Sequence, residues 1–197
     1  MAVWMLNAAE RERLNCFPTD ISSEEIITFF TLTPADKKQM PITTNASNRL
    51  GFALQLCTLR YLGFCPDKLI PVPVEVLEYL AKQLGIDPDS LSDYRKRAHT
   101  RTDHLQVIQA YLGFRKVTQT DFTVLTAWLL DRALEHDKPS FLLQLPCEKL
   151  YKEKIVRPGI TRLERMIATA RSQAQTETFK RVSPLLTLEQ KIFLMIY

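Results

Sequence analysis

The sequence predicts an all-α fold, and three features of its 197 residues indicate this. Apolar residues recur at helical spacing, small polar residues that cap helices precede these stretches, and glycines follow several of them. The clearest repeat is Ile160, Leu163, Ile167, Ala170 and Ala174, whose spacings of 3, 4, 3 and 4 are typical of an amphipathic helix. A chain of this length forms one domain or two small ones and buries a core without disulfides or metals.

Capping residues mark the helix starts in the first third of the chain. The segment Ser22-Ser23-Glu24-Glu25 precedes apolar residues and is typical of a capping box that opens a short helix. Thr33 followed by Pro34 repeats this pattern, with a cap and then a proline at the first helical position. Residues 45–62 are apolar on almost every face, which predicts a buried central helix that ends at Gly63.

The middle of the chain continues as helices separated by turns. Residues 68–76 are rich in Ile and Val, but Pro71 and Pro73 lack ladder donors, so we expect an extended connector. Further helices are predicted from Pro73 to Leu84 before Gly85, from Asp87 to Tyr94, from Thr100 to Leu112 before Gly113, and after a cap at Thr120 or Asp121.

Two helices end with similar residues, fifty positions apart. The segments are Arg60-Tyr61-Leu62-Gly63-Phe64 and Ala110-Tyr111-Leu112-Gly113-Phe114. Such a match indicates either a duplicated helical unit or two independent uses of the same helix-ending chemistry.

The composition is that of a soluble globular protein. Hydrophobic residues make up 46% and charged residues 24% of the chain. No apolar run reaches the roughly 18 residues of a membrane span, and the N-terminus lacks the pattern of a signal peptide. The four cysteines are irregularly spaced and form no CxxC motif, which predicts reduced thiols in a cytoplasmic protein.

The sequence contains no catalytic or metal-binding pattern. The phosphate-binding, dinucleotide-binding and nucleophile-elbow motifs are absent. His99 and His104 are five residues apart instead of the four that place two ligands on one helix face, and no cysteine lies near them. We therefore expect no enzymatic activity from this segment, no metal and no cofactor.

Basic residues are concentrated in the second half of the chain. Residues 1–90 contain 8 Lys or Arg and 11 Asp or Glu, whereas residues 141–197 contain 10 and 5. A local basic excess indicates either a polyanion-binding surface or a solvated basic face. The last basic run leaves both interpretations open and comprises Lys149, Lys152, Lys154, Arg157, Arg162 and Arg165.

The densest cationic cluster lies at residues 94–104, before and at a predicted helix start. Backbone N–H groups and the helix dipole attract phosphate at such a position, and arginine also binds guanine edges in the major groove. This pattern fits the recognition helix of a helix-turn-helix, and the alternative is a solvated basic turn. The residues concerned are Arg95, Lys96, Arg97, Thr100, Arg101, Thr102 and His104.

A second polar helix start precedes the apolar central helix. Its small polar side chains and one arginine can reach bases or phosphates while the rest of the helix anchors in the core; the alternative is ordinary N-capping by Asn45 or Ser47. The predicted DNA-binding set adds Asn45, Ser47, Asn48 and Arg49 from this start, and Arg115 and Lys116 from the segment after the second repeat. We expect phosphate contacts from Arg95, Lys96, Arg97, Arg115 and Lys116, and base contacts from the others.

Residues 48–63, from Asn48-Arg49-Leu50-Gly51-Phe52 to Tyr61-Leu62-Gly63, resemble the block near the N-terminus of the Tn-three family of replicative transposases. Weaker matches flank this block and include residues 79–85 and Gly113-Phe114-Arg115. The resemblance covers about the first 135 residues well, with departures at Pro41 and at Cys65-Pro66-Asp67.

This resemblance implies tandem helix-turn-helix units, similar to those of centromere protein B, that bind the terminal inverted repeats of a transposon. Catalysis in this family belongs to a separate RNase H-like domain, which nothing in this sequence matches. The expected organisation is one unit at residues 1–66, a second at 67–137 and a basic helical segment at 138–197. The chain ends on an apolar helix, so we expect it to be the front of a longer protein.

The expected partner is therefore double-stranded DNA, bound in a bacterial cytoplasm in association with the nucleoid, with self-association through the rest of the transposase. No membrane contact is expected. The alternative function is a protein-interaction or dimerisation module of the same transposase.

Overall fold

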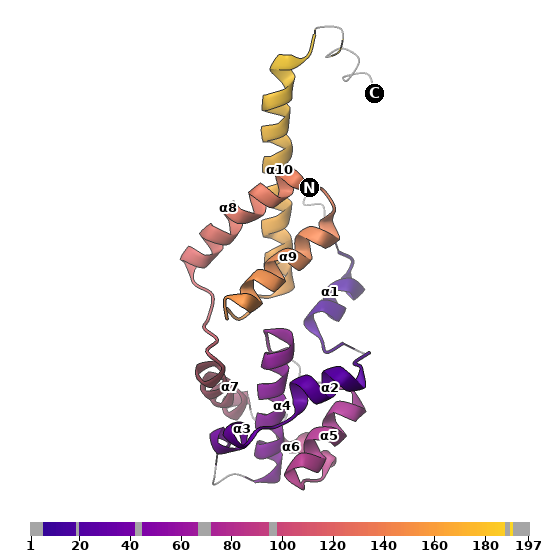
Figure 1. The fold of residues 1–197 in the computed structure, drawn as a ribbon, viewed down its shortest axis with the longest axis vertical. Helices are drawn as coiled ribbons and strands as arrows, with labels where there is room; N and C mark the ends of the chain where they lie inside the picture. Colours follow the sequence, from indigo (N-terminus) through magenta and orange to yellow (C-terminus); the bar gives the residue numbers. More distant parts are fainter. Residues whose placement is uncertain are drawn as a thin grey trace. The chain divides into compact units, whose positions relative to one another are not determined.

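The computed structural model describes residues 6–18, 20–41, 45–66, 72–94, 98–187 and 190, and their regular elements are all helical (Figure 1). This confirms the predicted all-α fold. The elements are α1 (Ala8–Asn15), α2 (Ser23–Phe30), α3 (Pro34–Gln39), α4 (Ala46–Leu62), α5 (Val74–Leu84), η1 (Pro88–Ser90), α6 (Leu91–Tyr94), α7 (Ala98–Leu112), α8 (Gln119–Glu135), α9 (Pro139–Lys152), α10 (Ile160–Val182) and η2 (Ser183–Leu185).

The chain divides into two compact units. The large unit comprises Ala8–Val117 and Leu150–Pro158, and the small unit comprises Met1–Asn7, Thr118–Lys149 and Gly159–Tyr197. The expected segments 1–66, 67–137 and 138–197 stay a prediction, and the two compact units group parts of them together. The physical reason is that α4, from the first expected segment, packs against α7, from the second, so that both contribute to one core.

Helix α4 is the centre of the large unit, as its apolar composition predicts. Figure 1 shows it between α7 and α5, and it also packs against α2 and α6. Each residue from Leu50 to Leu59 is buried. A helix buried on all sides needs partners on all sides, which explains why segments from both expected units surround it.

Local capping sets most of the helix limits that the sequence predicts. Ser22 and Thr33 each form a capping box with the acidic residue three positions later, and Gly63 ends α4 in the left-handed conformation at φ +72°. The start of α8 differs from the expected cap at Thr120 or Asp121. Thr118 is the N-cap, because Asp121 is the third residue of this helix and closes a capping box with Thr118.

Residues 150–158 contact the C-terminal ends of both α4 and α7. The amide of Arg157 donates to the carbonyl of Gly63 after α4, at 3.1 Å. After α7, the amide of Arg115 donates to the carbonyl of Lys154, and that of Val156 donates to the carbonyl of Arg115, each at 2.9 Å. The two similar helix ends therefore lie together at one end of the large unit.

The small unit contains α8 and α10, which pack on each other along their apolar faces, and most of α9. The buried positions of α10 include Leu163, Ile167, Ala170 and Ala174, as their spacing predicts. Among the residues that the structure describes, no helix is long and apolar enough to cross a membrane.

Candidate nucleic-acid interface

The N-terminal ends of α4 and α7 lie at the same end of the large unit. The rings of Phe52 and His104 meet edge to face, with centroids 5.2 Å apart. About two turns later, Arg60 of α4 and Tyr111 of α7 both bind the carboxylate of Asp36. The two helices are therefore parallel. Because both C-terminal ends contact residues 150–158, both N-terminal ends lie at the opposite end of the large unit.

Arg49 and Arg101 occupy equivalent positions on these two helices. Each lies three residues before the Phe52–His104 contact, which is about one helical turn towards the N-terminus. The side chain of Arg49 is exposed and that of Arg101 is half-buried, and neither forms an ion pair with any residue that the structure describes. Two guanidinium groups without an ion-pair partner among the described residues therefore lie at the common end of the two helices, where both helix dipoles are positive.

The other polar residues at the start of α4 divide into a cap and two buried side chains. Asn45 is exposed, and its side chain accepts the amide of Asn48 at 3.0 Å, so it is the N-cap. Ser47 and Asn48 are only 6% and 8% exposed. Their atoms Oγ and Oδ1 have no hydrogen-bond partner within the described part of the chain. Of the four residues expected here, the structure leaves Asn45 and Arg49 on the surface.

His104 lies in the core instead of on the surface, so we remove it from the expected base-reading residues. Its side chain is 6% exposed, and its Nδ1 lies 2.8 Å from the hydroxyl of Tyr94, which donates to Oε1 of Gln55. Since that hydroxyl proton is committed to Gln55, the Nδ1–H of His104 donates to Tyr94. The sequence could have indicated this burial, because His104 is four residues before the buried Ile108 and therefore lies on the same face of the helix.

Burial lowers the pKa of His104, and nearby Asp103 opposes this shift. Since the unfolded chain binds the proton more readily, we expect stability to fall as pH decreases through about 6.5 and to level off below the folded-state pKa. Urea unfolding at pH 7.5, 6.5 and 5.5 measures this effect. The variant His104→Gln should lose this dependence of stability on pH. If its free energy of unfolding still changes with pH as in the unaltered chain, other groups cause the dependence.

The remaining expected residues fall into three places. At the start of α7, Thr100 is half-buried and Thr102 is exposed, beside Arg101. Arg115 and Lys116 are exposed, but they follow the C-terminal end of α7 and lie at the opposite end of the large unit. Residues Arg95, Lys96 and Arg97 lie outside the described residues. The structure thus brings Asn45, Arg49, Thr100, Arg101 and Thr102 together and separates them from Arg115 and Lys116.

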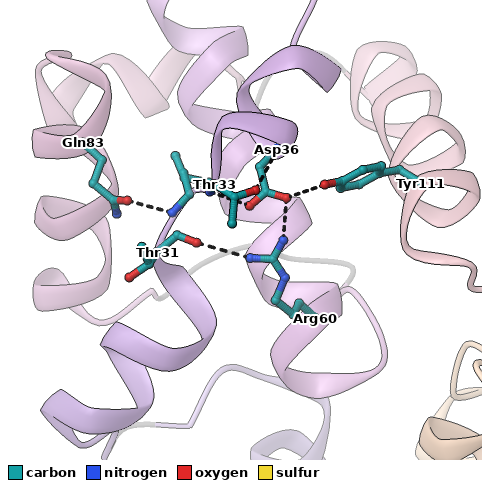
Figure 2. A network of polar contacts seen from close by, with 7 residues as sticks. Thr31, Thr33, Asp36, Arg60, Gln83 and Tyr111 are labelled. Carbon is teal, nitrogen blue, oxygen red and sulfur yellow. Dashed lines mark hydrogen bonds and ion pairs between the residues drawn. The ribbon is translucent and has the colours of Figure 1, made fainter.

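A buried polar cluster fixes α3, α4 and α7 relative to one another (Figure 2). Asp36 is 1% exposed, and its Oδ1 accepts from Arg60 Nη2 at 2.7 Å and from the Tyr111 hydroxyl at 2.9 Å. Its Oδ2 accepts the amide of Thr33 at 2.8 Å. Burial raises the pKa of Asp36, but these hydrogen bonds and the positive charge of Arg60 outweigh it and lower the pKa overall.

Because each oxygen of Asp36 is occupied within the fold, this cluster orients helices and offers no reactive carboxylate. No group of three or more His, Cys, Asp or Glu residues in the described ranges is arranged to hold a metal ion. The surface at the starts of α4 and α7 is suited to binding an anionic partner through guanidinium, hydroxyl and amide groups.

Comparison with known proteins finds transposases among the relatives of this chain. Residues 5–170 match the family described as "Domain of unknown function (DUF4158)". The chain is 36% identical over 188 residues to the transposase for transposon Tn1546 of Enterococcus faecium and 31% identical over 182 residues to the transposase for transposon Tn501 of Pseudomonas aeruginosa. These alignments cover 95% and 92% of the chain, but only 19% and 18% of the relatives' length.

Proposed function

Because the chain belongs to the DUF4158 family and its relatives are transposases of the Tn-three family, we propose that it binds double-stranded DNA in transposition. The specific target proposed is the terminal inverted repeat of a transposon. In this proposal the chain acts as the DNA-binding part of a longer transposase, and α4 and α7 serve as the recognition helices of helix-turn-helix units.

The observation that carries this proposal is the common end of two helix N-termini, where Arg49 and Arg101 form no ion pair with any residue that the structure describes. The positive ends of helix dipoles and free backbone N–H groups attract phosphate. Arginine forms paired hydrogen bonds with phosphate or with guanine. Thr100, Thr102 and Asn45 belong to the same two helix starts, and we propose them as shorter polar contacts.

Arg95, Lys96 and Arg97 remain proposed phosphate contacts, because they immediately precede α7 in the sequence. Arg115 and Lys116 form a separate proposed phosphate contact at the other end of the large unit. Backbone contacts of this kind make affinity strongly dependent on salt.

We expect the double variant Arg49→Ala, Arg101→Ala to bind a transposon-end duplex at least about thirtyfold more weakly, since each lost arginine contact costs about 1–3 kcal/mol. Fluorescence anisotropy with a labelled inverted-repeat duplex measures the dissociation constant. The matched control is Arg13→Ala, Lys82→Ala, which removes two exposed cations from α1 and α5.

Equal affinity of the two double variants would contradict the proposed site. Binding of the unaltered chain to a scrambled duplex as tightly as to the inverted repeat would contradict specific recognition. The alternative, a dimerisation module, predicts no duplex binding at any salt concentration together with a doubled mass in light scattering.

A further inference from the structure

The small unit has a cationic groove that the proposed function does not use. It lies where α8 meets the start of α10, has a volume of about 650 Å³, and has no acidic residue in its lining. Arginine and threonine supply its polar groups. The lining residues are Thr126, Gly159, Thr161, Arg162, Arg165, Met166 and Thr169.

Arg162 is held in a defined orientation at this groove. Its guanidinium carbon lies 3.4 Å from the ring centroid of Phe122, a residue of α8 that is only 8% exposed. A guanidinium stacked on an aromatic face keeps its N–H groups free at the edge of the plane. The stacking therefore presents hydrogen-bond donors to a ligand at a reduced cost in side-chain entropy.

Arg165 is exposed and lies three residues after Arg162, so both cations project from one side of α10. Neither has an ion-pair partner within the described part of the chain. Two cations near the N-terminal end of a helix oppose its dipole. The helix dipole therefore does not account for their position, whereas both cations would stabilise an anion bound beside them.

The start of α10 adds backbone groups to this lining through Gly159 and Thr161. Gly159 is the N-cap and offers no side chain to the first amides, and the first turn contains no acidic residue. The amides of Arg162 and Leu163 donate to the carbonyl of Gly159. An acid-free groove lined by two arginines at a helix start has the chemistry that recognises a phosphate group.

We propose that this groove binds a backbone phosphate of DNA, as a second contact in addition to that of the large unit. The choice of DNA as the polyanion rests on the proposed function, whereas the anion site itself rests on the groove. Two linked contacts on one duplex increase the overall affinity through effective concentration.

The test uses the complete 197-residue chain and the double variant Arg162→Gln, Arg165→Gln, because glutamine keeps the aliphatic stem without the charge. The control Lys180→Gln, Arg181→Gln removes the same charge from the other end of α10. Anisotropy with inverted-repeat and scrambled duplexes is measured over a range of salt concentrations. We expect the groove variant to weaken binding to both duplexes and to reduce the slope of log K against log salt by about 1–2 relative to the control.

Thermal unfolding is measured in parallel, and we expect a Tm close to that of the unaltered chain. The loss of the Arg162–Phe122 stacking and the removal of cations from the positive end of a helix act in opposite directions. If that variant does not fold, Arg165→Gln alone is used, because this exposed side chain has no packing partner comparable to Phe122. For Arg165→Gln we expect the slope of log K against log salt concentration to fall by about 1.

Identical DNA binding by the groove variant and its control would overturn the groove proposal. If the Arg49, Arg101 variant nevertheless weakens binding, the proposed function stands without the groove. If only the groove variant weakens binding, the groove stands and the site on the large unit falls. A titration with inorganic phosphate is followed through the Nε–H signal of Arg162. If phosphate saturates the groove but the groove variant binds the duplex as tightly as its control, the groove binds a free anion and the DNA assignment is overturned.

Discussion

Replacing Asp36 by alanine is expected to lower the free energy of unfolding by about 3–5 kcal/mol, because removing one partner of a buried ion pair leaves the other uncompensated. Arg60 loses its 2.7 Å carboxylate partner, and the Tyr111 hydroxyl loses its acceptor. The capping box at the start of α3 is lost as well. Chemical denaturation followed by circular dichroism measures the change.

The variant Glu78→Ala is the control, because it removes an exposed carboxylate from α5 and should change stability by no more than about 0.5 kcal/mol. The pH dependence provides a second measurement. The pKa of Asp36 is lowered in the folded state, so its stabilisation is present above the unfolded pKa of about 3.9 and is lost as pH falls through the folded value. Acid unfolding of Asp36→Ala that is as steep as that of the unaltered chain would refute this role.

The second large effect is expected at Gly51, where alanine should destabilise the large unit by about 3 kcal/mol, the upper end of the range for overpacking. A Cβ atom at this position would lie 2.3 Å from atoms of the Tyr94 ring, and that ring is 1% exposed and cannot move into solvent. Helix propensity alone predicts the opposite sign, a gain of about 1 kcal/mol. Whether Gly51→Ala lowers or raises the free energy of unfolding therefore shows whether the close contact with Tyr94 exists.

Urea unfolding of Gly51→Ala measures this sign. Gly159→Ala is the control for added volume alone, since a Cβ atom there meets nothing within 4 Å, and its expected cost is that of alanine at an N-cap. Because Tyr94 directly precedes the cationic segment 95–97, we also expect Gly51→Ala to weaken duplex binding. If the urea midpoint of Gly51→Ala is equal to or higher than that of the unaltered chain, α4 and Tyr94 do not pack as described.

The parts of the fold that the sequence predicts are those decided within one or two helical turns. The caps at Ser22 and Thr33 and the stop at Gly63 depend on neighbouring residues alone, and the structure confirms them. The error at the start of α8 had a local cause, because Asp121 resembles a cap but acts as the third residue of a box that begins at Thr118.

The parts that local patterns missed depend on distant residues. Nothing near Arg60 in the sequence indicates that its charge is matched by Asp36, 24 positions away. Likewise, the buried state of His104 depends on Phe52, Gln55 and Tyr94 from other helices. Of the candidate site, the sequence predicts the cationic residues at the helix starts, but it does not predict that Arg49 and Arg101 share one end while Arg115 and Lys116 occupy the other.

The hydrogen bonds between residues 150–158 and the ends of α4 and α7 have a consequence for biosynthesis. As the polypeptide leaves the ribosome, α2 to α7 emerge well before the segment that closes them, and α8 and most of α9 are translated in between. The large unit therefore reaches its final hydrogen bonding only after residue 158 has left the exit tunnel. A polypeptide that stops at residue 137 has all the residues of the large unit that are proposed to contact the inverted repeat but lacks the segment that joins their helices.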